Sequence, residues 1–192
     1  MKKKSFVMVL ALVLVFAVAV GGVVAWLTAT TGSVKNTFTV GDINITLTES
    51  GTNDAGEKSY QVIPGDVEDK DPKVTVVAGS EACYLFVKVD VANNTVNGKA
   101  IYIFDVRDDG WMKLEDGVYY REVDAATAEA GEEYYVLKGD ATYANGLVRI
   151  NQDLTKADIN DIKTDPTLTF TAYAVQKDNV DSAAAAWTIA NS

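Results

Sequence analysis

The chain has 192 residues, a formal net charge of −10, one cysteine and no histidine. Without histidine it has no imidazole ligand for a metal, no His-based catalytic triad and no His-driven pH switch. A single cysteine excludes an intramolecular disulfide, and the acidic balance disfavours nucleic acid as a partner.

The first 25 residues have the layout of a secretory signal peptide. Three lysines at positions 2–4 precede an apolar run from Phe6 to Val24, and small residues end the run at Ala25. This order is typical of an export signal, so we expect residues 1–25 to be a signal helix that is removed after Ala25. Cleavage would create a new amino terminus at Trp26. The alternative is an uncleaved membrane anchor, because the uncharged run continues to Leu27 and about 20 such residues span a bilayer.

Beyond residue 36, apolar residues recur with a period of two, which indicates strands. The clearest strand is Ala82–Val91, in which Cys83 shares the apolar face and is therefore expected in the core. A second long strand is expected at Thr167–Gln176, and Asp116-Gly117 is a typical hairpin dipeptide. Shorter strands are expected at Phe38–Val40, Ile43–Leu47, Tyr60–Ile63, Lys73–Val77, Ala100–Arg107, Trp111–Leu114, Val118–Tyr120, Tyr134–Leu137 and Gly146–Ile150.

Helical patterns are short. Asp153–Lys163 is predicted to be a helix capped by Asp153, Ala125–Gly131 is expected to form a helical turn, and Asp181–Trp187 a short helix near the C-terminus. We therefore predict an all-β fold: an antiparallel β-sandwich of the jelly-roll type, with one or two short helices and an N-terminal signal helix. The pattern alone leaves an immunoglobulin-like sandwich and a barrel open.

Motifs at both ends of the chain resemble the TasA/camelysin family. At the N-terminus the resemblance is carried by Gly21-Gly22, Ala25-Trp26, Asn36-Thr37-Phe38, Gly41 and the alternating Ile43, Ile45 and Leu47. Further similar segments are Ile63–Asp66, Asp71–Val76, Tyr84–Val89, Leu168–Gln176 and Trp187. Proteins of this family carry a dedicated, SipW-type signal peptide. The resemblance implies that a Gram-positive signal peptidase processes the chain during export.

The resemblance also implies a secreted structural protein of the cell surface or biofilm matrix. In the family, fibres form when the N-terminal segment of one subunit completes a sheet in the next, so the implied partners are further copies of the chain and other matrix proteins. Residues 26–35 would be an N-terminal extension that can donate a strand, and residues 36–192 the TasA-like β-sandwich domain. The candidate strand-donor residues are Trp26, Leu27, Val34, Phe38 and Val40. The alternatives are that Phe38–Leu47 is the first strand of its own domain and that residues 26–35 are a tail.

We expect no enzymatic activity, no metal site and no cofactor. The camelysin branch of the family is described as proteolytic, but a zinc protease of the HExxH type needs two histidines, and Cys83 has no histidine as a base. The acidic clusters at Asp66–Asp71 and Asp105–Asp109 offer oxygen ligands for calcium without the spacing of an EF-hand. We interpret them, and the pair Asp158 and Asp161, as solvated surface.

Aromatic residues flank the hairpin at Asp116-Gly117. Trp111, Tyr119 and Tyr120 are expected to form cross-strand pairs that stabilise the sheet, and an aromatic platform for a sugar is the alternative. A monomeric surface adhesin or ligand-binding module is accordingly the function that competes with matrix assembly.

Overall fold

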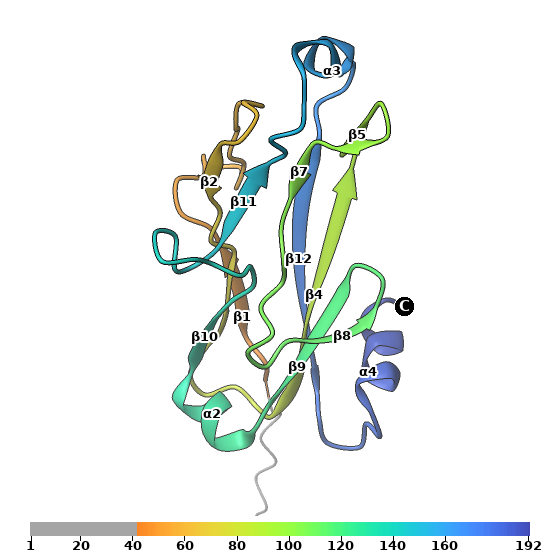
Figure 1. Ribbon diagram of the computed structural model, residues 1–192. Helices are drawn as coiled ribbons and strands as arrows, with labels where there is room; N and C mark the ends of the chain where they lie inside the picture. The colour runs from red at the N-terminus through yellow and green to blue at the C-terminus, as the bar shows by residue number, and fades with distance from the viewer. Residues whose placement is uncertain (1–41) are drawn as a thin grey trace, which may run out of the picture. The chain divides into compact units, whose positions relative to one another are not determined.

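The computed structural model describes residues 42–192 (Figure 1). The expected signal peptide at residues 1–25, the extension at residues 26–35 and the strand expected at Phe38–Val40 lie outside this range and stay predictions. The described residues contain twelve strands and three short helices, and all the strand pairings are antiparallel.

One layer of the fold consists of two three-stranded sheets. The first has the order β1 (Ile45–Thr48), β3 (Lys73–Val76), β10 (Glu132–Tyr135), and the second has the order β2 (Val67–Asp69), β11 (Leu147–Ile150), β7 (Tyr102–Ile103). In Figure 1, β2 and β11 lie above β1 and β10 on the left of the molecule. Because β2 leads directly into β3, the two sheets follow one another along the same layer.

The other layer is a four-stranded sheet with the order β12 (Thr167–Gln176), β4 (Cys83–Ala92), β9 (Val118–Val123), β8 (Met112–Glu115). β12 pairs with β4 along its whole length. Asp116-Gly117 connects β8 and β9 as the predicted hairpin, with a register shift between Lys113 and Glu115. A separate small hairpin is formed by β5 (Thr95–Val96) and β6 (Lys99–Ala100).

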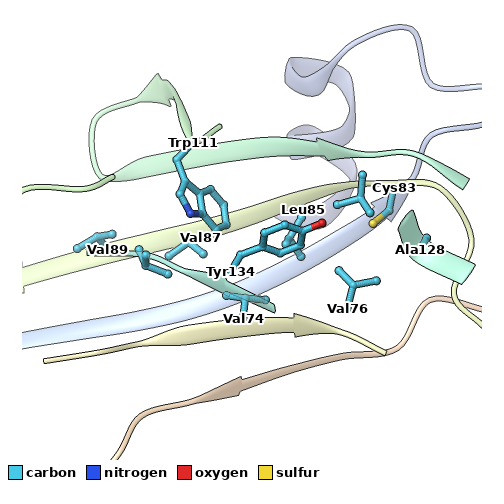
Figure 2. Packing of buried hydrophobic residues seen from close by; sticks show 11 residues of the cluster. Val74, Val76, Cys83, Leu85, Val87, Val89, Trp111, Ala128 and Tyr134 are labelled. Atoms are coloured by element: carbon cyan, nitrogen blue, oxygen red, sulfur yellow. The ribbon is translucent and has the colours of Figure 1, made fainter. Parts of the chain in front are cut away.

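The main core lies between the two layers. Figure 2 shows Val74 and Val76 of β3 on one side and the apolar row of β4 on the other. Burying one such aliphatic side chain contributes about 1.5–3 kcal/mol. The cluster consists of Val74, Val76, Cys83, Leu85, Val87, Val89, Trp111, Val123, Ala128, Tyr134 and Val136. A second cluster, around Ile101, Leu137 and Ile150, continues the core from the sheet of β7 and β11 to Leu168 and Phe170 of β12.

The outer face of the four-stranded sheet is covered by α4 (Ala183–Ala190). Trp187 packs against two aromatic rings of the sheet. Its ring centroid lies 5.4 Å from that of Phe86 and 5.3 Å from that of Tyr173. Ser182 caps this helix by accepting a hydrogen bond from the Ala185 N–H. The first half of β4, residues 83–87, is therefore buried on both faces, which explains its unbroken apolar sequence, whereas the strand ends in three exposed residues.

The two remaining helices are each six residues long. α2 (Ala125–Ala130) follows Asp124, whose carboxylate accepts a backbone N–H of the first turn. α3 (Lys156–Asp161) is shorter than the predicted helix at residues 153–163. Its cap is Thr155 and not Asp153, because Thr155 and Asp158 form a reciprocal capping box.

The all-β prediction is confirmed, since antiparallel strands dominate the described residues, although three helices stand where one or two were expected. The strand predicted at Tyr60–Ile63 is wrong, because this segment is irregular and Ile63 is 46% exposed. The strand predicted at Ala100–Arg107 is interrupted: Ala100 ends β6, Tyr102–Ile103 is β7, and Val106 forms an isolated bridge. The side chain of Asn94 accepts the N–H groups of Ile101 and Tyr102, which ends the ladder there.

Candidate functional site

The outer strands of the sheets are the places where another chain could pair, and most of them are protected. β8 is short, carries Lys113 and Glu115, and contains a register shift. β10 begins with two glutamates, β2 contains Glu68 and Asp69, and β7 has two residues. Short length, charge and bulges are the usual means by which proteins block pairing at sheet edges.

β12 has none of these protections. It is ten residues long, contains no charged residue and, within the described residues, pairs only with β4. Its opposite edge therefore presents backbone N–H and C=O groups to which the described part of the chain supplies no partner strand. β12 is the longest such edge in residues 42–192 and is ready to accept an added strand.

The side chains of β12 alternate between two environments. Leu168, Phe170, Ala172 and Ala174 point inward and pack against the main core, yet each is only partly buried. Tyr173 and Val175 point to the opposite face, beneath α4. An additional strand beside β12 would cover the inward row and complete its burial.

β1 lies next to β12 and is the outer strand of the other layer (Figure 1). Within residues 42–192 the two strands are not hydrogen bonded to each other, and β1 pairs only with β3. Leu47 of β1 is 37% exposed although its partner in the ladder, Val74, is fully buried. We call the neighbouring strands Ile45–Thr48 and Thr167–Gln176 the β1–β12 seam.

A buried ion pair lies at one end of this seam. Lys70 Nζ lies 2.8 Å from Glu49 Oε2 and 5.4 Å from the ring centroid of Phe170 in β12. The Tyr60 hydroxyl lies 3.1 Å from Glu49 Oε1. Burial and then the Glu49 carboxylate raise the pKa of Tyr60 well above its usual value, so the phenol remains a hydrogen-bond donor. The pair ties the end of β1 to the segment between β2 and β3.

The acidic clusters considered for calcium are not brought together. Within residues 42–192 no group of three or more His, Cys, Asp or Glu side chains could hold a metal ion. Asp71 accepts hydrogen bonds from Ser50 instead. Asp108 and Asp109 pair with Lys138 and Arg107.

The aromatic platform is also not formed. Trp111 is 5% exposed, belongs to the main core and donates its indole N–H to the Tyr135 carbonyl at 3.0 Å. Tyr119 packs against the same cluster, whereas Tyr120 lies on the opposite face of the sheet. The three rings therefore do not share a surface. Arg121, which follows Tyr120 directly, stacks on Tyr134, with its guanidinium carbon 3.7 Å from the ring centroid.

The other polar residues named from the sequence have structural roles. Cys83 is fully buried, as predicted, and burial raises the pKa of its thiol to about 11. The interpretation of Asp158 as a solvated residue is wrong. It is 5% exposed, and hydrogen bonds from Lys99, then Asn97 and Thr155, hold the pKa of its carboxyl well below its usual value.

A shallow hollow beside α3 is the alternative candidate for a ligand. It is lined by Asn93, Thr95, Val96, Ile101, Asp161, Ile162, Lys163 and Thr164, with a volume of about 240 Å³. Pockets for small molecules are usually about 300–1,000 Å³ and mainly apolar. This hollow is therefore a weaker candidate than the edge of β12 to which the described residues supply no partner strand.

Comparison of the chain with protein-family models, with curated proteins and with solved structures finds no match. None of the three described helices combines the length and apolar character that crossing a bilayer requires. The expected cleavage residues Ala25 and Trp26 and the donor candidates Leu27, Val34, Phe38 and Val40 lie outside the described residues.

The structure supplies the part of the site that sequence reasoning missed. The strand Thr167–Gln176 was predicted, but its position at the edge of the sheet was not, because that position depends on distant pairings. The ion pair of Lys70 and Glu49 was missed as well. The one available signal was the absence of charge over a ten-residue strand.

Proposed function

We propose that this protein is a secreted, non-enzymatic structural protein of the cell surface or biofilm matrix, whose copies assemble by strand addition. In this proposal it is a TasA-like β-sandwich of the jelly-roll type. The observation that carries the proposal is the edge of β12 that residues 42–192 leave unpaired. This edge is long and uncharged, whereas the outer edges of the other strands are short, charged or bulged. An extended segment can add to such an edge through backbone hydrogen bonds, while its side chains set the register.

The proposed occupant is the N-terminal segment, residues 26–41, of a second copy. An extended strand advances about 3.3 Å per residue in both partners, so ten residues of the segment suffice to pair along the ten residues of β12. The remaining residues form a linker to the body of the second copy. Within Val34–Val40, apolar residues alternate with polar or charged residues, and the one break in this pattern is Asn36, which stands at an apolar position. Cleavage after Ala25 would free this segment from the membrane.

Charge also favours this occupant. The one charged side chain in residues 26–41 is Lys35, whereas all 27 acidic residues of the chain lie in residues 42–192. The acidic bodies of two copies repel one another, and the N-terminal segment of one copy carries the opposite sign. A donor of this composition is therefore not repelled by an acidic neighbour.

A lysine on the edge of β12 tests the proposal. Thr171→Lys in the mature chain, residues 26–192, should abolish polymers seen by electron microscopy and light scattering, because a lysine on an edge strand blocks pairing. Thr75→Lys is the matched control, since Thr75 is also partly exposed but lies on β3, between β1 and β10. Polymers that survive Thr171→Lys and Thr75→Lys equally would contradict the assignment of the edge.

A mixing experiment separates donation to a neighbour from pairing within one chain. Residues 42–192 keep the acceptor edge but lack the donor, and the mature chain with Thr171→Lys keeps the donor but has a blocked edge. Each should remain monomeric, and an equal mixture should form a one-to-one complex in analytical ultracentrifugation. If the two chains do not associate, the N-terminal segment does not act between copies.

A further inference from the structure

The inward row of β12 changes in size along the strand. Leu168 and Phe170 occupy its first half, and Ala172 and Ala174 its second half. The alanines are partly buried and pack against the main core. Two small side chains in succession at a free edge leave room beside them for a large side chain on an added strand.

The same part of the seam exposes apolar surface on the other layer. Ala172 pairs with Val87 and Ala174 with Leu85 in the ladder with β4. Across the core, Leu47 and Ile45 pair with Val74 and Val76, which belong to the same cluster as Val87 and Leu85. Ile45 is only partly buried, and Leu47 is 37% exposed.

We infer that Phe38 of a second copy packs over Ala172 and Ala174 and sets the register of the added strand. This inference rests on the proposed function and names the side chain by which the β12 edge recognises its donor. Phe38 is the one aromatic residue between positions 27 and 41. Side chains on one face of a strand recur every second residue, so in an added strand Phe38 would share its face with Val34, Asn36 and Val40.

A slip of the added strand by one residue would turn Phe38 away from the core and present Lys35, Thr37 and Thr39 instead. A slip by two residues toward the start of β12 would keep the face but place Phe38 beside Phe170, whose larger ring occupies that part of the row. A slip by two residues toward the end of β12 would place Phe38 beside the exposed Gln176. The alanine pair therefore admits Phe38 in one register and disfavours its neighbours. The partner recognised is a second copy of this chain, through an aromatic residue in a strand of alternating polarity.

The mixing experiment measures this contact directly. With the donor chain (residues 26–192 with Thr171→Lys) and the acceptor chain (residues 42–192), Phe38→Ala in the donor should weaken the complex by about tenfold or more, because a large buried side chain is lost. Phe38→Leu should weaken it less. Thr39→Ala, which removes a β-branched residue from the opposite face of the same strand, should have only a small effect.

A size exchange supplies the second arm. The acceptor with Ala172→Leu should bind the unsubstituted donor more weakly, because the added side chain fills the space for Phe38. The same acceptor should bind the Phe38→Ala donor more tightly than the unsubstituted acceptor binds it. Melting of each acceptor alone shows whether it remains folded, and Ala174→Leu repeats the exchange at the neighbouring position. If Phe38→Ala binds as tightly as Thr39→Ala, the Phe38 contact is refuted while strand addition stands. If the unsubstituted donor and acceptor do not associate, the proposed function itself fails.

Discussion

Lys70 Nζ contacts both carboxylate oxygens of Glu49, at 2.8 and 3.1 Å, with the two side chains only 9% and 12% exposed. The residues are far apart in sequence, and their contact holds the end of β1 against the segment that joins β2 to β3. Phe170 of β12 lies beside the ammonium group. The ion pair therefore fixes one end of the seam at which we place strand addition.

Breaking this ion pair from one side should destabilise the fold. Lys70→Met leaves the Glu49 carboxylate buried without its cation, which costs about 3–5 kcal/mol. The double variant Lys70→Met with Glu49→Leu should recover most of that loss, because no buried charge remains. Urea unfolding of residues 42–192 measures both variants. A single variant as stable as the unsubstituted chain would show that the pair is solvated.

Trp187 should hold α4 on the outer face of the four-stranded sheet. It is 7% exposed and packs against Phe86 and Tyr173, so Trp187→Ala should cost about 3–5 kcal/mol of the free energy of unfolding. Ile189 is on the same helix but 55% exposed, and Ile189→Ala should change that free energy by no more than about 0.5 kcal/mol. Equal effects of the two substitutions on thermal melting would contradict the packing of α4.

The Cys83 thiol should be unreactive in the folded protein. Burial raises its pKa from 9.0 to about 11, so the folded state keeps the proton where the unfolded chain loses it. Its contribution to stability is therefore fully present below pH 9.0 and is lost as pH rises toward 11. A thiol-reactive dye at about pH 8 should label one thiol per chain in urea and none without it. Rapid labelling of the native chain would refute the buried position.

Asp158 should make the end of the molecule near α3 sensitive to acid. Its pKa lies well below the ordinary value of 3.8 because of hydrogen bonds from Lys99, then Asn97 and Thr155. The folded state therefore favours the carboxylate, and this contribution is present above pH 3.8 and lost as pH falls. The Asp158→Asn variant should be less stable than the unsubstituted chain at neutral pH. On acidification its free energy of unfolding should fall by a smaller amount than that of the unsubstituted chain. Asp161→Asn, at an exposed position, should behave like the unsubstituted chain. Identical acid-unfolding curves for all three proteins would contradict this role.

Long strands with clear alternation could be predicted from the sequence. Thr167–Gln176 was placed at its observed limits and Ala82–Val91 within one residue of Cys83–Ala92, because each presents at least one continuous apolar face. β2, β6 and β7 have two or three residues each, too few to show a period. Tyr60–Ile63 alternates as a strand does, but the Tyr60 hydroxyl is bound by Glu49 and the segment pairs with nothing in residues 42–192.

The candidate site likewise has one part that local sequence features indicate and one part that depends on contacts between distant residues. The proposed donor segment comes from the sequence, because alternation and a preceding cleavage signal are local features. The acceptor edge could not, since a strand is an outer strand only when pairings across the whole fold leave one side free. Asp158 was misjudged for a related reason: its burial depends on Lys99 and Asn97, which lie about 60 residues away.

Light scattering of two purified forms, residues 26–192 and residues 42–192, at matched concentration tests the central claim most directly. We predict that only the longer form grows into polymers and that adding the shorter form limits their length, because the shorter form has an acceptor edge but no donor. If the longer form remains monomeric, or if both forms polymerise alike, assembly through the N-terminal segment is contradicted.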